Sequence, residues 1–348
     1  MSWDNTLRLN DEELTAVKAL LRETANPDND ISRAAMHQLA KAVELPLRKG
    51  FFIGDTVGNI FSREDLEPDA APKYPLDFVG PSGERNYYAF RIADEGAIPD
   101  RLVKGDEVTV DTFQLGNAVS WKLQYARVAR WPMVERALKI FRDGFVAKVN
   151  DEGWRVILRA IGNRYDTQYS QVTGSAFTLG LLSDMQLKMK RGIDFARNEL
   201  TDLYVSSEVM KDIRDFATTT SIDYLTRREI FQAVPRPDGN GGEVIIPTIY
   251  GVSIHELKQL GNGRDYNTTF NSLNTNLSGF DTTTDEVVVG LDLTPEGKSN
   301  YVMPIRRDLE MFEDPTLHRE QKAGVYGWME LSFALLDDRR ALAGWIDV

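Results

Sequence analysis

The chain has 348 residues, of which 42% are hydrophobic and 27% charged, a balance typical of folded globular proteins. Acidic residues outnumber basic ones 53 to 41, and the net charge of −12 argues against a protein that grips nucleic acid through a basic face. The absence of cysteine excludes disulfides, thiolate catalysis and cysteine-ligated metals. No apolar run approaches the roughly 20 residues of a membrane helix, and the acidic start is no secretory signal. A soluble intracellular protein is expected.

Two short helices are expected within residues 1–50, because apolar residues recur at helical spacing on both sides of a breaker at 25–30. Residues 51–82 then combine prolines and glycines with isolated aromatic residues and show no sustained period. Proline fixes its own backbone and disfavours helix at the preceding residue. We therefore expect this segment to bury little of itself and to lie along something else.

Residues 84–123 are predicted to form a long β-ribbon. Two β-rich runs, 86–92 and 107–115, flank a charged connection at 93–106. Strands of 10–15 residues would span roughly 35–50 Å, and an isolated two-stranded ribbon is only marginally stable in water. The ribbon therefore needs a surface to rest on, either a neighbouring molecule or, as the alternative, its own domain.

The strongest helix signal begins at Trp131-Pro132, where proline suits the first helical position. An apolar stripe continues to Val149 at steps of three and four residues. A break is expected near 151–153, before a second apolar stretch at 154–162. Packing of this stripe against a sheet is favoured over a cofactor groove.

The remaining elements follow from local patterns. Ser183 and Gln186 resemble a capping box that opens a helix over 184–198, and Ser206 or Ser207 is expected to cap a helix over 206–217. The turn-rich run 237–242 predicts a hairpin, and the Asn/Thr/Ser-rich stretch 267–284 predicts a long surface loop. Strands are expected at 203–205, 230–234, 243–252, 286–293, 299–305 and 327–336, the last two central in a sheet.

No motif for catalysis or for metal or cofactor binding is complete. His255-Glu256 lacks the second ligand of a zincin motif, because residue 259 is Gln. Gly261-Asn262-Gly263 lacks the third glycine of a dinucleotide loop, and Asp281 with Asp285 does not fit a calcium loop. The run 337–340 (DDRR) is read as a solvated turn. No cofactor is expected, and an enzyme is disfavoured.

The order of these elements resembles the major capsid proteins of tailed bacteriophages, the HK97-fold family. A long charged hairpin (84–123) leads into a long amphipathic helix (131–161), like the family's E-loop and spine helix. The stretch 201–216 resembles the strand and helix of the family's axial domain. The tail from 301 to 348 resembles the family's closing strands, with PIRRDL, EDP, a Gly- and Tyr-rich strand start and the final DDRR turn.

This resemblance implies an α+β fold with an N-terminal arm, an extended β-hairpin E-loop, a spine helix in a peripheral domain, and an axial domain with a central sheet and flanking helices. The implied divisions are an N-terminal arm with short helices (1–82), the E-loop (83–123), the peripheral domain with the spine helix (124–175), the axial domain (176–320) and the return strands of the peripheral domain (321–348).

The implied function is self-assembly into hexamers and pentamers of an icosahedral shell around double-stranded DNA, in a virion assembled in the host cytoplasm. Implied partners are other copies of the chain, a separate scaffolding protein, a portal, optionally a cement protein, and non-specifically packaged DNA, with no membrane. Ribbon-mediated contacts between subunits are expected to involve Tyr87, Tyr88, Phe90, Arg91, Arg101, Lys104, Asp106, Glu107, Phe113 and Trp121.

Some relatives join subunits through an isopeptide bond between an E-loop lysine and an asparagine. Lys104 is a candidate donor by position, but no asparagine is convincingly placed, so non-covalent locking is favoured. Because the chain begins at Met1, no proteolytic removal of a leading scaffold segment is expected. The alternatives are an encapsulin-type nanocompartment shell and a soluble hydrolase that works through paired carboxylates.

Overall fold

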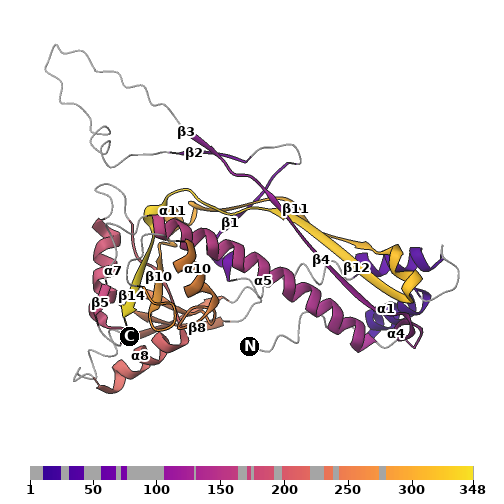
Figure 1. Ribbon diagram of the computed structural model, residues 1–348, viewed down its shortest axis with the longest axis horizontal. Coiled ribbons are helices and arrows are strands. Elements are labelled where there is room, and N and C mark those ends of the chain that lie inside the picture. The colour runs from indigo at the N-terminus through magenta and orange to yellow at the C-terminus, as the bar shows by residue number, and fades with distance from the viewer. Residues whose placement is uncertain are drawn as a thin grey trace, which may run out of the picture.

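The computed structural model describes residues 11–24, 31–42, 56–67, 72–76, 106–128, 131–163, 171–173, 176–191, 198–219, 231–237, 243–273 and 280–347. These residues form an α+β structure in which one long helix runs beside two separate sheets (Figure 1). Helices α7 and α8 lie at one end of the molecule, and the N-terminal helix α1 lies at the other.

The first sheet has the strand order β1-β11-β12-β4, and β13 pairs with β11. Strand β1 runs parallel to β11, whereas the other pairings are antiparallel. The strand expected at 299–305 is confirmed as part of the central strand β11. The strand expected at 327–336 is divided, because its first part belongs to the central strand β12 and its last part to β13, which pairs only with β11. The strands are β1 (Ser62–Asp65), β4 (Phe113–Lys122), β11 (Tyr301–Glu313), β12 (Lys322–Leu331) and β13 (Ala334–Leu335).

The long helix α5 (Trp131–Asn163) has 33 residues, which corresponds to about 50 Å. The break expected near 151–153 is wrong, because the helix continues without interruption. Two ion pairs within one turn support this stretch, Lys148 with Glu152 at 2.5 Å and Arg155 with Asp151 at 3.5 Å. A Cβ atom on Gly153 would lie 2.4 Å from Val57 Cγ1, so this glycine allows close packing of the N-terminal segment rather than ending the helix.

The second sheet has the order β5-β14-β10-β6-β9-β8-β7 and is covered on both faces. One face packs on α7 (Leu179–Arg191) and α8 (Ser207–Thr219) through a cluster that includes Val288. The other face packs on α5 and α10 (Asp265–Leu273) through a cluster that includes Val287 and Val289. The strands are β5 (Gln171–Thr173), β6 (Asp202–Val205), β7 (Phe231–Pro237), β8 (Glu243–Ile249), β9 (Val252–Glu256), β10 (Glu286–Leu291) and β14 (Ala341–Asp347).

The predictions for the helices that flank this sheet had mixed outcomes. Ser183 does not cap α7, because the helix begins at Leu179 and the Leu181 N–H donates to Thr178 Oγ1 at 3.3 Å. The cap of α8 is confirmed, since the Val209 N–H donates to Ser206 Oγ at 3.0 Å. The hairpin of β7 with β8 is also confirmed.

The predicted surface loop at 267–284 is wrong for its first part, which belongs to α10. Tyr266, Asn267 and Phe270 are buried there. The side chain of Asn267 is held inside because its Nδ2 donates to the carbonyl of Asp285 at 2.8 Å. The polar composition of this stretch predicted a loop, although its first part is a helix with a narrow buried face.

The N-terminal segment packs on its own subunit. Helix α1 (Asp11–Glu23) and a helix over residues 31–42 confirm the two predicted helices, and Leu21 and Leu39 are buried in the same core as α5. They lie near α4 (Leu123–Arg127) at one end of α5 (Figure 1). Helix α3 (Val57–Ile60) and β1 also contact α5 and β11. Residues 56–67 thus lie along their own chain, and not along a neighbouring subunit as the resemblance to an N-terminal arm implies.

Sheet membership also differs from the expected division at residue 320. Strand β11 pairs with β12 in the first sheet, although 301–313 was assigned to the axial domain. Strand β14 pairs with β10 along six residue pairs in the second sheet, although 341–347 was assigned to the peripheral domain. Hydrogen bonding between strands distant in sequence decides this membership. The short helices α11 (Pro295–Lys298), η3 (Pro315–Glu320) and η4 (Asp338–Arg340) connect these strands.

Candidate assembly surfaces

A two-stranded stem forms the first candidate surface. Strand β2 (Lys73–Leu76) pairs antiparallel with β3 (Asp106–Thr109), and Leu76 lies opposite Asp106 at the end of the stem. This pair forms a small sheet of its own, apart from the two main sheets (Figure 1). The chain from 77 to 105 therefore begins and ends at one point, the end of the stem.

The base of the stem is fixed to the first sheet. Tyr74 and Val110 form a small buried cluster with Val302 of β11. The Tyr74 hydroxyl donates to Glu64 Oε2 at 2.6 Å, and burial together with this carboxylate raises the pKa of Tyr74 well above its usual range. The stem is thus held at its base while its opposite end meets the segment 77–105.

The strand expected at 107–115 is two strands with different partners, and the first of them pairs with residues 73–76, outside the expected ribbon of 84–123. Residues 106–109 belong to β3, and residues 113–122 belong to β4 of the first sheet. The Val110 N–H donates to the carbonyl of Pro72 at 3.0 Å, and its side chain enters the small cluster at the stem base, so the chain leaves the stem there. The part of the ribbon from 113 onward rests on its own subunit.

The structure places four of the ten predicted contact residues. Asp106 and Glu107 lie in β3, where Glu107 Oε2 is 3.9 Å from Lys73 Nζ. Phe113 is half-buried at the start of β4. Trp121 is only 6% exposed and belongs to the subunit's own core, because odd-numbered positions of β4 face inward; it offers no contact surface here. Outside the described residues lie Tyr87, Tyr88, Phe90, Arg91, Arg101 and Lys104.

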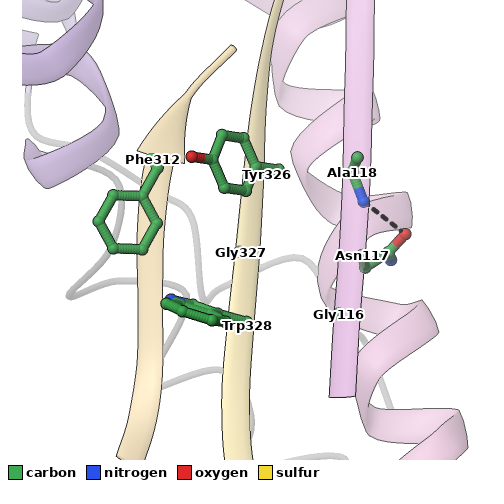
Figure 2. A pocket seen from close by; sticks show the side chains of 7 residues that line it. All are labelled: Gly116, Asn117, Ala118, Phe312, Tyr326, Gly327 and Trp328. Atoms are coloured by element: carbon green, nitrogen blue, oxygen red, sulfur yellow. Dashed lines mark hydrogen bonds between the residues drawn. The ribbon is translucent and has the colours of Figure 1, made fainter. Parts of the chain in front are cut away.

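An exposed group of three aromatic side chains forms the second candidate surface. We call Phe312, Tyr326 and Trp328 the aromatic platform (Figure 2). Tyr326 and Trp328 are 40% and 38% exposed. Phe312 stacks on Tyr326 with ring centroids 5.6 Å apart and meets Trp328 edge-on at 6.1 Å. Large exposed apolar groups that gather in one patch are typical of surfaces that bind another protein.

The neighbouring strand leaves a hollow beside the platform. Tyr326 lies opposite Ala118 and Trp328 opposite Gly116 in the pairing of β12 with β4, and these residues line one shallow pocket with the platform (Figure 2). Because Gly116 and Ala118 carry almost no side chain, the aromatic rings stand above their surroundings. An apolar side chain of another molecule can enter this hollow without displacing protein groups.

Charged groups flank the platform on the same sheet. The Arg307 guanidinium lies 5.6 Å from the centroid of the Trp328 ring, a cation–π arrangement. Glu330 accepts hydrogen bonds from Thr112 Oγ1 at 2.6 Å and Arg306 Nη1 at 2.8 Å. These bonds lower the pKa of Glu330, the Thr112 hydroxyl contributing most.

The sequence analysis did not predict the platform. The alternation of Tyr326 and Trp328 along one strand could have indicated two aromatic residues on one face. That Phe312 joins them follows only from the pairing of β11 with β12.

The incomplete His255-Glu256 motif does not have the geometry of a zincin site. His255 lies in strand β9 rather than on a helix, and its Nε2 is 2.7 Å from Asp202 Oδ1. Across the described part of the chain, no group of three or more His, Cys, Asp or Glu residues could hold a metal ion. Among the described helices, none is both long and apolar enough to cross a membrane.

No family model and no curated protein matches this sequence. Solved structures do match, at low sequence identity. The head of Helicobacter pylori bacteriophage KHP40 aligns with a TM-score of 0.52 and 8% identity, over 85% of this chain and 91% of that chain. The mature capsid of bacteriophage PhiM1 aligns with a TM-score of 0.50 and 10% identity, over 84% and 87%. The chain has the HK97 capsid fold.

The α+β fold class predicted from the sequence is thereby confirmed. The SrpI encapsulin of Synechococcus elongatus also aligns, with a TM-score of 0.48 and 12% identity over 83% of this chain and 85% of that chain. In the HK97 fold of this chain, the stem is a separate two-stranded sheet anchored on β11, and the aromatic platform lies on β11 and β12 of the first sheet.

Proposed function

We propose that this chain is the major capsid protein of a tailed phage, which assembles with copies of itself into hexamers and pentamers of an icosahedral shell around double-stranded DNA. The observation that supports this proposal best is the HK97 fold, shared over 84–85% of the chain with a phage capsid and a phage head. We infer a structural rather than an enzymatic role from the same neighbours.

The proposed mechanism is closure through many weak contacts. The described surface is asymmetric, with the stem on one part of the molecule and helices α7 and α8 on another (Figure 1). Contacts between two different surfaces close into rings when the rotation between subunits fits. Because each subunit engages several neighbours, the closed shell is far more stable than one contact alone.

The segment between β2 and β3 is proposed to bridge subunits as the E-loop. Each half of residues 77–105, about 14 residues, could span roughly 45 Å if extended. The aromatic platform is proposed to face another copy, because its apolar rings lose contact with water there. Exposed ion pairs of Arg91, Arg101 or Lys104 would contribute about 0–1 kcal/mol each, so they would set the register more than the strength.

The remaining partners belong to the same proposal. A separate scaffolding protein, a portal and optionally a cement protein would act during assembly in the host cytoplasm, and the mature location would be the virion capsid. Subunits would be joined non-covalently rather than through Lys104. The acidic net charge of −12 suits a wall that does not hold the packaged DNA tightly.

Electron microscopy of the purified protein, combined with size-exclusion chromatography, tests the proposal. We expect closed particles or capsomers, and nuclease-protected DNA inside particles that form during infection. Particles filled with a cargo protein instead of DNA would favour a nanocompartment. A monomer that never assembles at high concentration, with or without co-expressed phage proteins, would contradict shell formation.

Replacing residues 77–105 with a two-residue Asn-Gly turn tests the bridging role. The stem should remain paired, because Leu76 and Asp106 already lie opposite each other and Asn-Gly favours a tight hairpin. We expect a folded, soluble subunit that forms no closed shells. Normal particles from this variant would show that the segment does not bridge subunits.

A further inference from the structure

Only two short linkers join the strands of one main sheet directly to the strands of the other within the described residues. Residues 292–300 connect β10 to β11, and residues 336–340 connect β13 to β14. The two linkers lie side by side, because the Asp292 N–H donates to the carbonyl of Arg340 at 2.9 Å and the Leu336 N–H donates to the carbonyl of Asn300 at 2.9 Å. Any rotation of one sheet relative to the other must deform this junction.

A buried ion pair crosses between the linkers. Arg340 Nη1 is 2.6 Å from Asp292 Oδ2, and the two side chains are only 10% and 0% exposed. The other oxygen of Asp292 accepts from the Thr294 N–H at 3.1 Å and from its hydroxyl at 2.7 Å. Asp292 is thus held by both linkers, and separating it from Arg340 would leave a charge without its partner in the interior.

Aromatic packing keeps water away from this junction. The Tyr301 hydroxyl donates to the carbonyl of Arg340 at 2.8 Å. The Tyr301 ring meets Phe61 edge-on at 5.8 Å, and Phe61 meets Phe333 at 5.1 Å. Phe61 directly precedes β1, the edge strand of the first sheet, so the N-terminal segment also packs at this junction.

The first linker packs tightly against the acidic partner of the pair. A Cβ atom on Gly297 would lie 2.5 Å from the carbonyl oxygen and 2.6 Å from Oδ1 of Asp292. Helix α11 therefore sits directly on the acidic partner. On the second linker, Asp337 Oδ1 accepts from the Arg339 N–H at 3.0 Å and holds its turn.

We propose that the Asp292–Arg340 pair is a lock that fixes the angle between the two sheets, so that the subunit presents its stem and its helical end in one set orientation. Asp292 and Arg340 are positioning residues in this device. The inference concerns the single chain and does not depend on the proposed shell function.

Single-molecule FRET between dyes on the two sheets tests the lock. Because the chain has no cysteine, Ser120→Cys on β4 and Lys190→Cys on α7, both exposed, give a specific label pair. Labelled chains are diluted with unlabelled chains, so that assembly does not add signals between subunits. We expect one narrow peak for the parent protein and a peak at least twofold broader for Arg340→Gln or Asp292→Asn, while Arg340→Lys keeps a narrow peak.

Two further variants separate orientation from stability. Asp292→Asn with Arg340→Met removes both charges of the pair and keeps the oxygen that accepts from Thr294, so it should melt closer to the parent protein than either single variant and still give the broad peak. Lys322→Gln breaks an exposed ion pair with Glu320, 2.7 Å long, and should leave the peak narrow. A narrow peak for the folded double variant, or a broad peak for the parent protein, would overturn the lock.

Discussion

Gly153 illustrates how one residue decides where two elements meet. It sits within α5, where Val57 of the N-terminal segment approaches its backbone. Two hydrogen bonds hold the same contact between the N-terminal segment and α5. The Val57 N–H donates to Asn150 Oδ1 at 3.1 Å, and Trp154 Nε1 donates to Thr56 Oγ1 at 3.4 Å. A glycine that suggests a helix break in the sequence therefore serves as the contact point for the N-terminal segment.

Gly153→Ala should destabilise the subunit. The new methyl group would lie 2.4 Å from Val57 Cγ1, and overpacking of this kind costs about 1–3 kcal/mol, more than the gain of up to about 1 kcal/mol in helix propensity. Chemical denaturation would measure the loss. Gly180→Ala is the control, because its nearest neighbour, Thr178 Oγ1, lies 3.6 Å away. Equal stability changes in both variants would contradict the close contact.

Glu286 is a buried carboxylate whose titration affects stability. Burial raises its pKa, the neighbouring charges of Glu208 and Asp212 add to the rise, and the Ser206 hydroxyl, which donates to Glu286 Oε2 at 2.6 Å, opposes it. A folded-state pKa above the unfolded value means that the folded state binds this proton more tightly. The contribution of Glu286 to stability is therefore lost as the pH rises through its folded pKa.

Glu286→Gln should remove this pH dependence. The amide oxygen can still accept the Ser206 hydrogen bond, whereas the buried charge is gone. We expect the variant to melt at a higher temperature than the parent protein at pH 7, with a difference that shrinks as the pH falls toward 4. Thermal melts across this range would measure it. A difference that stays constant with pH would contradict the explanation.

At the scale of elements, the platform lies on the face of the first sheet that does not pack on α5. Its aromatic rings stand on the outer face of β11 and β12, while the inner face of the same sheet packs on α5. The Asn117 Nδ2, which donates to the carbonyl of Phe141 at 3.0 Å, ties β4 to that helix from the inner side. The outer face is therefore available to a partner at little cost to the fold.

Trp328→Ala combined with Tyr326→Ala should leave the subunit folded and impair assembly. Because both rings are about two-fifths exposed, their joint loss should lower the free energy of unfolding by about 2–4 kcal/mol, well below the cost of emptying two core sites. Sedimentation would measure assembly. Leu187→Ala, at an exposed position of 45% on α7, is the control. Normal assembly of the double variant would exclude the platform as a contact.

At the scale of the whole molecule, net charge opposes association of identical copies. Each chain carries −12, and copies of like charge repel over the screening length, which falls from about 10 Å at 0.1 M salt to about 3 Å at 1 M. We expect the lowest concentration that supports assembly to fall as salt rises over this range. Light scattering would measure it. A threshold that rises with salt would indicate that attractive ion pairs dominate the contacts.

The sequence predicted the elements whose signals are local. The helix from Trp131, the cap at Ser206 and the hairpin of β7 with β8 depend on residues close in the chain, and the structure confirms them. The order of such elements was enough to indicate the HK97 fold. The errors at Gly153 and in α10 arose where a distant contact set the outcome. The error at Ser183 was local, because Thr178 rather than Ser183 accepts the first N–H bond of α7.

The sequence by itself determined the fold class, the core helix and strands, and the absence of disulfide or thiolate chemistry. Only the tertiary structure decided which sheet receives β11 and β14, where the N-terminal segment lies, that Phe312 joins Tyr326 and Trp328, and that Asp292 meets Arg340. The physical reason is the range of the forces involved. Helix caps and apolar periodicity act within a few residues, whereas strand pairing and buried charge pairs join groups far apart in the chain.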